Sequence, residues 1–369
     1  MNFDFTPECK AMAQEVRRVL ALQCPMQEVR RCLETGTHSE GTWKALAELG
    51  VIGAAVPEAW GGSGLGDLEL AACAEEVGRA CAPVPMLASV YLAAEALVVG
   101  GTDAQRARWL PELAAGRAIG TVATAAHGCT LVQGRLTGTL GAVPAGLQAD
   151  FLVVPAAGQQ LLVDLHAPQV TRRALRVLDP GSPMARLILA EAPTQALAPE
   201  AATALAAGRL VDRAAALLAF EQLGGAQRAL EMACAYAAQR RTFGRQVGSY
   251  QAVKHRLADV WVRNEIARGH AYRAAWALQA SPQEVPLAAA AARVACSEAF
   301  EFAAQENLHL HGGLGFTWEA DCHPLYKRAR SSALLLGPTQ RWKQRLAALA
   351  MRWPEAEEAA TAAEVERGL

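Results

Sequence analysis

Residues 236–251 read YAAQRRTFGRQVGSYQ and separate two long stretches of helical patterning. Before them an apolar stripe recurs every three or four residues, which is the spacing of one face of an α-helix. Its members are Leu217, Phe220, Leu223, Ala226, Leu230, Ala233 and Ala237. A second helical pattern covers about residues 248–280. The quoted stretch is therefore a short connection between two antiparallel helices.

The same pattern continues toward the end of the chain. Further helices are predicted at about residues 284–308 and 327–350. Four long helices with short connections imply an antiparallel four-helix bundle, which we assign to residues 201–353. Residues 354–369 are acidic and rich in alanine, so we expect a frayed tail there.

Residues 1–118 also show helical patterns, and turns interrupt them repeatedly. This region is predicted to be an N-terminal helical domain. Its helices are expected at about residues 8–22, 25–35, 39–50, 66–80, 86–99 and 102–115.

Residues 119–200 have a different character, with short β-like runs that glycine and proline separate. The runs are Ile119 to Thr124, Thr130 to Leu136, Asp150 to Val154, Gln160 to Val163 and Leu187 to Leu189. They predict a small antiparallel β domain in the middle of the chain. The fold class is therefore mainly α with a small β domain.

The composition argues against several classes of protein. The 35 Lys and Arg residues nearly cancel the 36 Asp and Glu residues, so charge gives no argument for a nucleic-acid partner. The apolar runs are interrupted by polar residues, and the first residues lack a basic and apolar leader. We therefore expect neither a membrane span nor a secretory signal. The nine cysteines lack C-x-x-C spacing, which indicates free thiols in a cytoplasmic protein. His309, His311 and His323 lack partners at ligand spacing, so we expect no metal site.

A glycine-rich stretch about 70 residues after the first one adds a second motif. Residues 311–319 read HGGLGFTWE, and an earlier loop at residues 57–62 reads PEAWGG. Together with the helical–β–helical order, these motifs resemble the acyl-CoA dehydrogenase family over nearly the whole chain. The GFTWE wording, followed by Tyr326 and Arg328, resembles a bacterial subgroup. Some members of that subgroup are the smaller subunit of heteromeric dehydrogenases that act on bulky acyl-CoA substrates, including steroid side chains.

The resemblance implies FAD as cofactor and an acyl-CoA thioester as substrate, which loses hydrogen from its α and β carbons. It gives Arg240 a role at the FAD pyrophosphate, and Phe243 and Gln251 a role at the adenylate half. In the family these residues meet the FAD of a neighbouring subunit. The resemblance therefore also implies a homo- or hetero-oligomer, of the dimer or tetramer-of-dimers type.

Three further residues are assigned to the same FAD by the resemblance. Gly312 and Gly313 would let the backbone approach the dinucleotide closely. His309 stands where the family has a glutamine, and histidine can still donate a hydrogen bond to a phosphate or an adenine. The alternative is that these are ordinary features of a turn between helices, with Arg240 on a solvated helix face.

The catalytic base of the family is missing from both of its usual places. Most members carry a glutamate just before a Gly-Thr in the last long segment. Residues 334–339 here read LLLGPT, and Leu336 occupies the position of the glutamate. A second family location, early on the first bundle helix, aligns with Ala214. Neither side chain can accept a proton.

Glu221 is the acid nearest to these positions in the alignment. Seven residues after Ala214 correspond to about 700° of helical rotation, so Glu221 lies on nearly the same stripe but about 10.5 Å farther along it. That offset is too large for direct proton transfer unless the alignment shifts by two turns. The alternative is an acid on the surface or between helices, paired with Arg228 or another cation.

Two other stretches depart from the family. Residues 121–128 read TVATAAHG and preserve little of the run that contacts the flavin ring and the substrate. Residues 327–330 read KRAR and lack the aspartate common there.

Three functions follow as hypotheses. The lost base and the retained FAD motif favour a base-lacking subunit of a heteromer, whose partner supplies the glutamate. The alternatives are an autonomous FAD-dependent acyl-CoA dehydrogenase with a shifted base, and a CoA- or partner-binding module without flavin. For either enzyme the resemblance implies an electron-accepting flavoprotein as a further partner.

Overall fold

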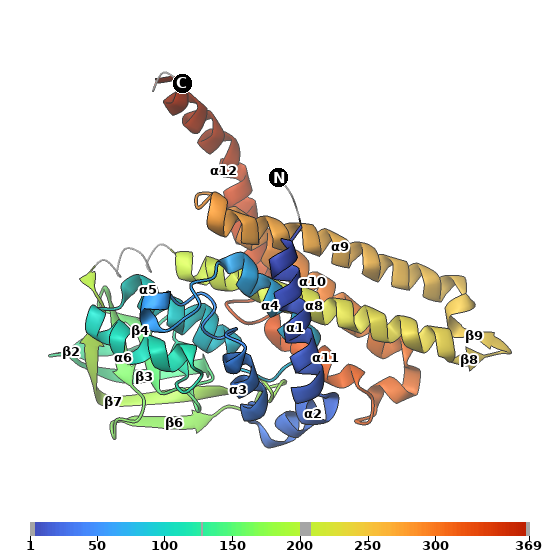
Figure 1. Cartoon of the computed structure of the whole chain (residues 1–369), viewed down its shortest axis with the longest axis horizontal. Coiled ribbons are helices and arrows are strands. Elements are labelled where there is room, and N and C mark those ends of the chain that lie inside the picture. The colour runs from blue at the N-terminus through green and yellow to red at the C-terminus, as the bar shows by residue number, and fades with distance from the viewer. Residues whose placement is uncertain (1–3, 127, 200–207, 367–369) are drawn as a thin grey trace.

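A helical bundle, a small β sheet and a layer of shorter helices share one large apolar core (Figure 1). The computed structural model describes residues 4–126, 128–199 and 208–366, with side chains described as far as Arg352. The predicted boundary at residues 200–201 and the last three residues of the predicted tail lie outside the described part. The mainly helical fold with a small β sheet is as predicted.

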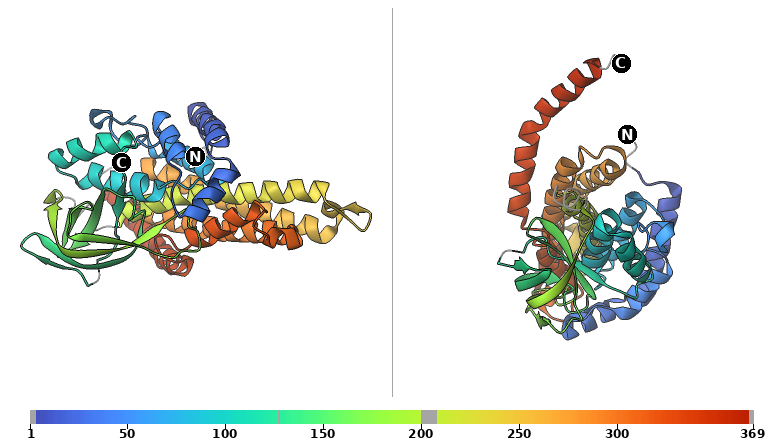
Figure 2. Two further views of the ribbon diagram at one scale, coloured as in Figure 1. Left: turned by 90° about the horizontal axis from the view of Figure 1, so that it is seen from below. Right: turned by 90° about the vertical axis from the view of Figure 1, so that its left-hand side faces the viewer.

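The bundle is built from long helices in the second half of the chain. They are α8 (Arg209–Gln239), α9 (Gln251–Ala280), α10 (Val285–Leu310), α11 (Cys322–Ser332) and α12 (Thr339–Glu366). Helix α10 packs along α8 and α9 and also contacts α11 and α12. Its alanine-rich sequence lets these neighbours approach closely, because small side chains keep the interaxial distance short. Helix α12 projects away from the rest of the molecule (Figures 1 and 2).

The single helix predicted at residues 327–350 is wrong. The structure has two helices there, α11 and α12, with a break at residues 333–338. Pro338 disfavours helical backbone at the residue before it and lacks an N–H to donate. Leu336 and Gly337 accordingly take positive φ angles of 60° and 101°. This break carries the position at which the family's glutamate was expected.

Short strands between residues 120 and 196 form one sheet. They are β1 (Gly120–Val122), β2 (Thr130–Val132), β3 (Arg135–Pro144), β4 (Phe151–Ala156), β5 (Gln159–Asp164), β6 (Val170–Ala174) and β7 (Met184–Ala196). Their order is β1-β4-β5-β7-β3-β2, with β6 also paired to β7. The pairs are antiparallel as expected, except that β1 and β4 run parallel. Strand β6, which reads VTRRA, was not predicted because it lacks an apolar alternation.

Shorter helices before the sheet lie across the same side of the sheet and the bundle (Figure 2). They are α1 (Pro7–Gln23), α2 (Met26–Thr35), α3 (Glu40–Glu48), α4 (Asp67–Arg79), α5 (Glu95–Gly100) and α6 (Asp103–Ala114). The PEAWGG loop contains the 3₁₀ turn η1 (Glu58–Trp60). The helix expected at residues 86–99 begins as a π-helix, η2 (Met86–Ala94), and continues as α5. Such π-helical turns often lie beside functional sites.

Helices α4 and α8 cross so closely that a glycine is required at the contact. A Cβ atom built on Gly78 would lie 1.8 Å from the carbonyl oxygen of Glu221. No side chain can occupy that space without separating the helices. Gly269 on α9 is different, because a Cβ atom there would meet no atom within 4 Å.

We expect Gly78→Ala to lower the free energy of unfolding by about 1–3 kcal/mol, since the added methyl group forces α4 away from α8. Gly269→Ala is the matched control and should raise it by about 0.5–1 kcal/mol through helix propensity alone. Urea unfolding of the two variants measures both effects. An unchanged midpoint for Gly78→Ala would contradict the close crossing.

Candidate functional site

The stretch at residues 236–251 forms the far end of the bundle. Helix α8 ends at Gln239 with Arg240 as its C-cap, and a hairpin of β8 (Arg241–Thr242) and β9 (Arg245–Gln246) leads to α9. The Val247 N–H closes this turn by donating to the Arg240 carbonyl at 2.8 Å. Phe243 stands at the tip with φ of 49° and 97 % of its surface exposed.

The second motif lies at the same end. Helix α10 leads into the turn η4 (Gly312–Phe316), and the rings of Tyr236 and His311 are 4.1 Å apart between centroids. The structure therefore brings together two motifs that are about 70 residues apart in the sequence. Gln251, at the start of α9, and His309, near the end of α10, are both exposed there.

The glycines of the second motif have different roles. A Cβ on Gly315 would lie 2.2 Å from the Leu308 carbonyl, so the chain's own packing requires that glycine. Gly312 has a φ of 59°, which favours glycine. A Cβ on Gly313 would meet no atom within 4 Å, and its φ is ordinary. Nothing in the described chain therefore explains why residue 313 is a glycine.

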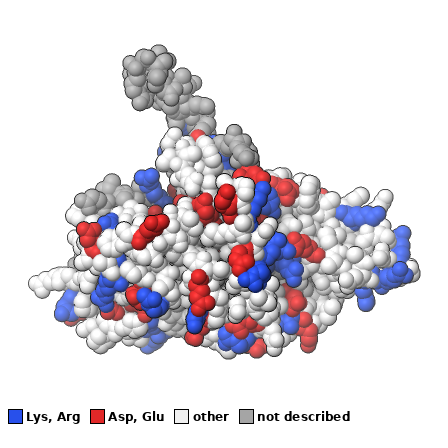
Figure 3. All heavy atoms as spheres, in the orientation of Figure 1, with Lys and Arg blue, Asp and Glu red and all other residues white. Residues whose placement is uncertain are grey.

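Cations surround these bare backbone segments. Arg240, Arg241, Arg245 and Lys254 are all exposed at this end of the bundle. Lys and Arg side chains gather there in the space-filling view (Figure 3). The Arg245 guanidinium lies 3.9 Å above the Tyr250 ring, which restrains it. Cations and uncovered backbone suit a diphosphate, so these residues fit the pyrophosphate and adenylate part of FAD.

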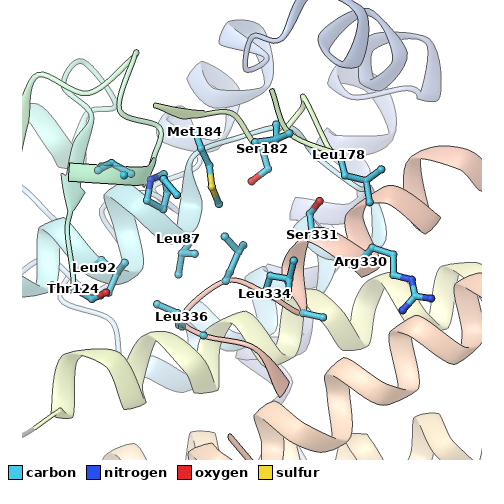
Figure 4. A pocket seen from close by; sticks show the side chains of 18 of the residues that line it. Leu87, Leu92, Thr124, Leu178, Ser182, Met184, Arg330, Ser331, Leu334 and Leu336 are labelled. Carbon is cyan, nitrogen blue, oxygen red and sulfur yellow. The ribbon is translucent and has the colours of Figure 1, made fainter. Parts of the chain in front are cut away.

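A cavity of about 1030 Å³ opens between the sheet and the bundle. Its wall comes from η2 through Leu87 and Leu92, from the segment after β1 through Thr124, and from β7 through Met184 (Figure 4). The break between α11 and α12 supplies a further group of lining residues, which are Ala333, Leu334, Leu335, Leu336 and Gly337. The cavity is large enough for a sizeable apolar ligand.

Leu336 faces this cavity (Figure 4). The residue expected at the position of the base therefore does line the cavity, but its side chain has no ionisable group. Ala214 is fully buried in α8 and does not line the cavity. Glu301 is the one acidic residue among the described residues that line the cavity, and its Oε1 atom lies 2.7 Å from a guanidinium nitrogen of Arg330. Arg330 points away from the cavity centre (Figure 4).

A much smaller inner pocket, of about 40 Å³, adjoins the cavity. The two share Leu87, Pro144, Ser182 and Leu335 in their walls. Glu221, Arg328 and Gln148 line the inner pocket. Arg328 is ion-paired with the buried Asp179 and also donates to the Ala82 carbonyl at 3.1 Å.

Glu221 has one carboxyl oxygen without a partner in this inner pocket. Its Oε1 atom is shielded from solvent and has no hydrogen-bond partner in the described chain. Burial raises the pKa of Glu221 from its ordinary value of 4.5, although the nearby Tyr91 hydroxyl and Arg328 act in the opposite direction. The described chain has no ion pair between Glu221 and Arg228, and the cation that acts on Glu221 is Arg328, which is itself ion-paired with Asp179.

Arg293, which was not among the residues predicted from the sequence, holds the break between α11 and α12 in place. This fully buried guanidinium donates to the carbonyls of Ser332 and Leu335, the latter at 2.8 Å. It also donates to Gln222 Oε1 on α8 at 2.5 Å. Burial lowers the pKa of Arg293 to about 10, so it remains charged at neutral pH. The sequence offered one sign of this role, because Arg293 is the single arginine in the otherwise largely apolar sequence of α10.

Gln148 was also missed, and it carries no signal in the sequence because it belongs to a loop between two strands. In the described part of the chain we find no group of three or more His, Cys, Asp and Glu side chains placed to hold a metal ion. None of the described helices is both long and apolar enough to cross a membrane.

Comparison with known proteins identifies similar chains over nearly the full length. A family model for the acyl-CoA dehydrogenase N-terminal domain matches residues 6–117, and one for the C-terminal domain matches residues 189–351. The acyl-CoA dehydrogenase IpdE2 of Mycobacterium tuberculosis is 34% identical over 333 residues, which cover 89% of this chain and 93% of the relative.

Two solved structures are similar along almost the whole chain. The steroid ACAD Tcur3481-Tcur3483 superposes with a TM-score of 0.85 at 31% identity, covering 96% of this chain and 99% of that one. The ChsE4-ChsE5 complex from Mycobacterium tuberculosis superposes with a TM-score of 0.86 at 28% identity, with the same coverage.

We expect Glu221→Leu to raise the free energy of unfolding by about 1–3 kcal/mol at neutral pH, because it removes a buried carboxyl group whose Oε1 atom lacks a partner. The gain should shrink as the pH falls. The pKa of Glu221 is higher in the folded chain than its ordinary value of 4.5 in the unfolded chain. Below pH 4.5 the carboxyl group is protonated in both states, so ionisation of Glu221 does not affect stability there. As the pH rises above 4.5, the unfolded chain loses this proton more readily, and the native glutamate therefore destabilises the fold increasingly.

Thermal unfolding at several pH values measures this dependence. Glu76→Leu is the contrasting variant, since Glu76 is bonded to Arg17 at 2.7 Å and its loss should lower stability. A lower melting temperature for Glu221→Leu at neutral pH would show that Glu221 has a partner after all.

Proposed function

Because this chain belongs to the acyl-CoA dehydrogenase family, we propose that it is the base-lacking subunit of a heteromeric enzyme that oxidises an acyl-CoA between its α and β carbons. The cofactor of the family is FAD, which accepts the hydride from the β carbon when bound. The observation that carries the proposal is Leu336, which faces the cavity where a carboxylate would be needed.

The reaction needs an acceptor for the α-proton, and the described cavity offers no ready one. The Glu301 carboxylate is held in an ion pair by Arg330, which points away from the cavity centre (Figure 4). Glu221 lines the smaller inner pocket and is not part of the wall of the large cavity. We therefore assign proton abstraction to a glutamate of a partner subunit.

The bundle end supplies the contribution of this chain to the partner's FAD. Arg240 neutralises the pyrophosphate, with Arg241 and Arg245 beside it, since cations are the favoured partners of phosphate oxygens. Phe243 and Gln251 meet the adenylate half, and His309 donates to a phosphate or the adenine. Gly312 and Gly313 let the backbone approach the dinucleotide. An outside ligand would also explain the glycine at position 313.

Exposed apolar side chains at the same end support an association. Phe243 is 97 % exposed, and Leu314 and Phe316 are 50% and 71% exposed. Covering such residues is favourable, at about 25 cal/mol for each Å² removed from water. The similar structures named above include a complex of ChsE4 with ChsE5. We propose that the partner here is likewise another acyl-CoA dehydrogenase subunit.

Two further features belong to the same proposal. The acyl group is bulky, in keeping with the 1030 Å³ cavity and with the steroid ACAD among the similar structures. The enzyme works in the cytoplasm and passes its electrons to an electron-accepting flavoprotein.

We expect the chain expressed alone to be colourless and inactive, and to become yellow and active only with its partner dehydrogenase subunit. The visible flavin spectrum and turnover of an artificial electron-accepting dye measure this. A chain that is yellow and active on its own would reject the heteromeric enzyme and leave the autonomous acyl-CoA dehydrogenase. Glu221, in the adjoining inner pocket, would then be the candidate for the catalytic base. In that case Glu221→Gln should abolish turnover without releasing flavin, and unchanged turnover would exclude Glu221 as the base.

We also expect Arg240→Ala to lower the FAD content of the purified complex at least about tenfold when FAD is limiting, because a buried charge-assisted contact to phosphate is lost. Arg173→Ala on β6 is the control, since Arg173 is an equally exposed cation far from the bundle end. Equal FAD content in both variants would remove Arg240 from the cofactor site.

A further inference from the structure

The inner pocket ends in polar atoms whose hydrogen bonds are not made. Glu221 Oε1 and Gln148 Oε1 both line this region, and both lack a partner in the described chain. Buried polar groups without partners are rare because each one destabilises the fold. Two of them in the wall of one pocket point to a ligand group that satisfies them.

The pocket is placed to receive the end of a ligand that lies in the large cavity. Leu87, Pro144, Ser182 and Leu335 belong to both walls and form the junction. The outer cavity is mainly apolar, with Leu92, Met184 and Leu334 in its wall (Figure 4). A ligand running through it would therefore be apolar along its length and polar at its inner end.

The atoms at the end of the pocket restrict what that polar group is. An amide oxygen such as Gln148 Oε1 only accepts hydrogen bonds, so the ligand must donate. Arg328 does not call for an anion, because Asp179 already neutralises it. A carboxylate next to Glu221 would meet a like group and no free cation. A hydroxyl group donates one hydrogen bond and accepts others, which suits both residues.

We propose that Glu221 and Gln148 form a specificity site for acyl-CoA molecules whose acyl group carries a hydroxyl at the end remote from the thioester. The hydroxyl donates to Gln148 Oε1 and exchanges a hydrogen bond with the Glu221 carboxyl. An acyl group that ends in a methyl leaves these buried polar atoms without partners. The inference rests on the proposed function in taking the ligand to be an acyl-CoA, but not on which subunit removes the proton.

The test measures binding instead of turnover. Isothermal titration of the complex compares ω-hydroxy hexanoyl-, octanoyl- and decanoyl-CoA with the corresponding unhydroxylated thioesters. At the chain length that reaches the inner pocket, the hydroxylated ligand should bind at least about tenfold more tightly. All substitutions are made in this chain alone, so a preference that belongs to the partner's site is left intact.

Glu221→Leu and Gln148→Leu should each reduce the preference toward equal binding, whereas Glu221→Gln should retain most of it because an amide still exchanges hydrogen bonds with a hydroxyl. Glu298→Gln is the control, since Glu298 is ion-paired with Lys343 on the surface of α10 and should leave the preference unchanged. The melting temperature of each variant shows that lost preference does not reflect lost folding.

Equal affinities at every chain length would overturn the inference, as would a preference that survives both leucine substitutions or a failure of both ligand series to bind. These outcomes are distinct from failure of the proposed function. A complex that turns over without any hydroxyl preference rejects the specificity site alone. A colourless complex that still prefers the hydroxylated ligand through Glu221 rejects the heteromeric flavoenzyme alone.

Discussion

The buried guanidinium of Arg293 is the interaction on which the architecture around the cavity depends. It lies between α8, α10 and the end of α11, and its acceptors are Gln222 and the carbonyls of Ser332 and Leu335. These acceptors are neutral, so the charge is stabilised by hydrogen bonds and not by an ion pair. Because a buried cation requires these bonds, the chain after α11 is held in one path. That path turns Leu336 into the cavity.

Helix α8 connects two surfaces with different chemistry. Its C-terminal end carries Arg240 among exposed cations and bare backbone, which is suited to a dinucleotide phosphate. Its first half carries Glu221, which faces a pocket within the protein. The first surface is open to another subunit, and the second is enclosed by the sheet and the bundle. One chain can therefore contribute to a cofactor site outside itself while it keeps a separate ligand chamber inside.

Local sequence patterns predicted most of the helices, since the spacing of apolar residues reports directly on which face is buried. They failed at residues 333–338, where three leucines continue an apolar helical pattern although Pro338 marks a boundary. Strand β6 was missed because an edge segment reading VTRRA shows no alternation. The parallel pairing of β1 with β4 was missed because apolar alternation carries no information on strand direction.

The amino-acid sequence by itself determined the family, through the motifs at residues 236–251 and 311–319, and it predicted that Leu336 and Ala214 occupy the places of the base. These are statements about residue type at a position, which require no coordinates. Only the tertiary structure decided the environment of Glu221. The inner pocket joins residues 148, 221 and 328 from separate elements, and burial there raises the pKa of the Glu221 carboxyl. Desolvation and unmade hydrogen bonds arise from how distant elements pack, so no local pattern records them.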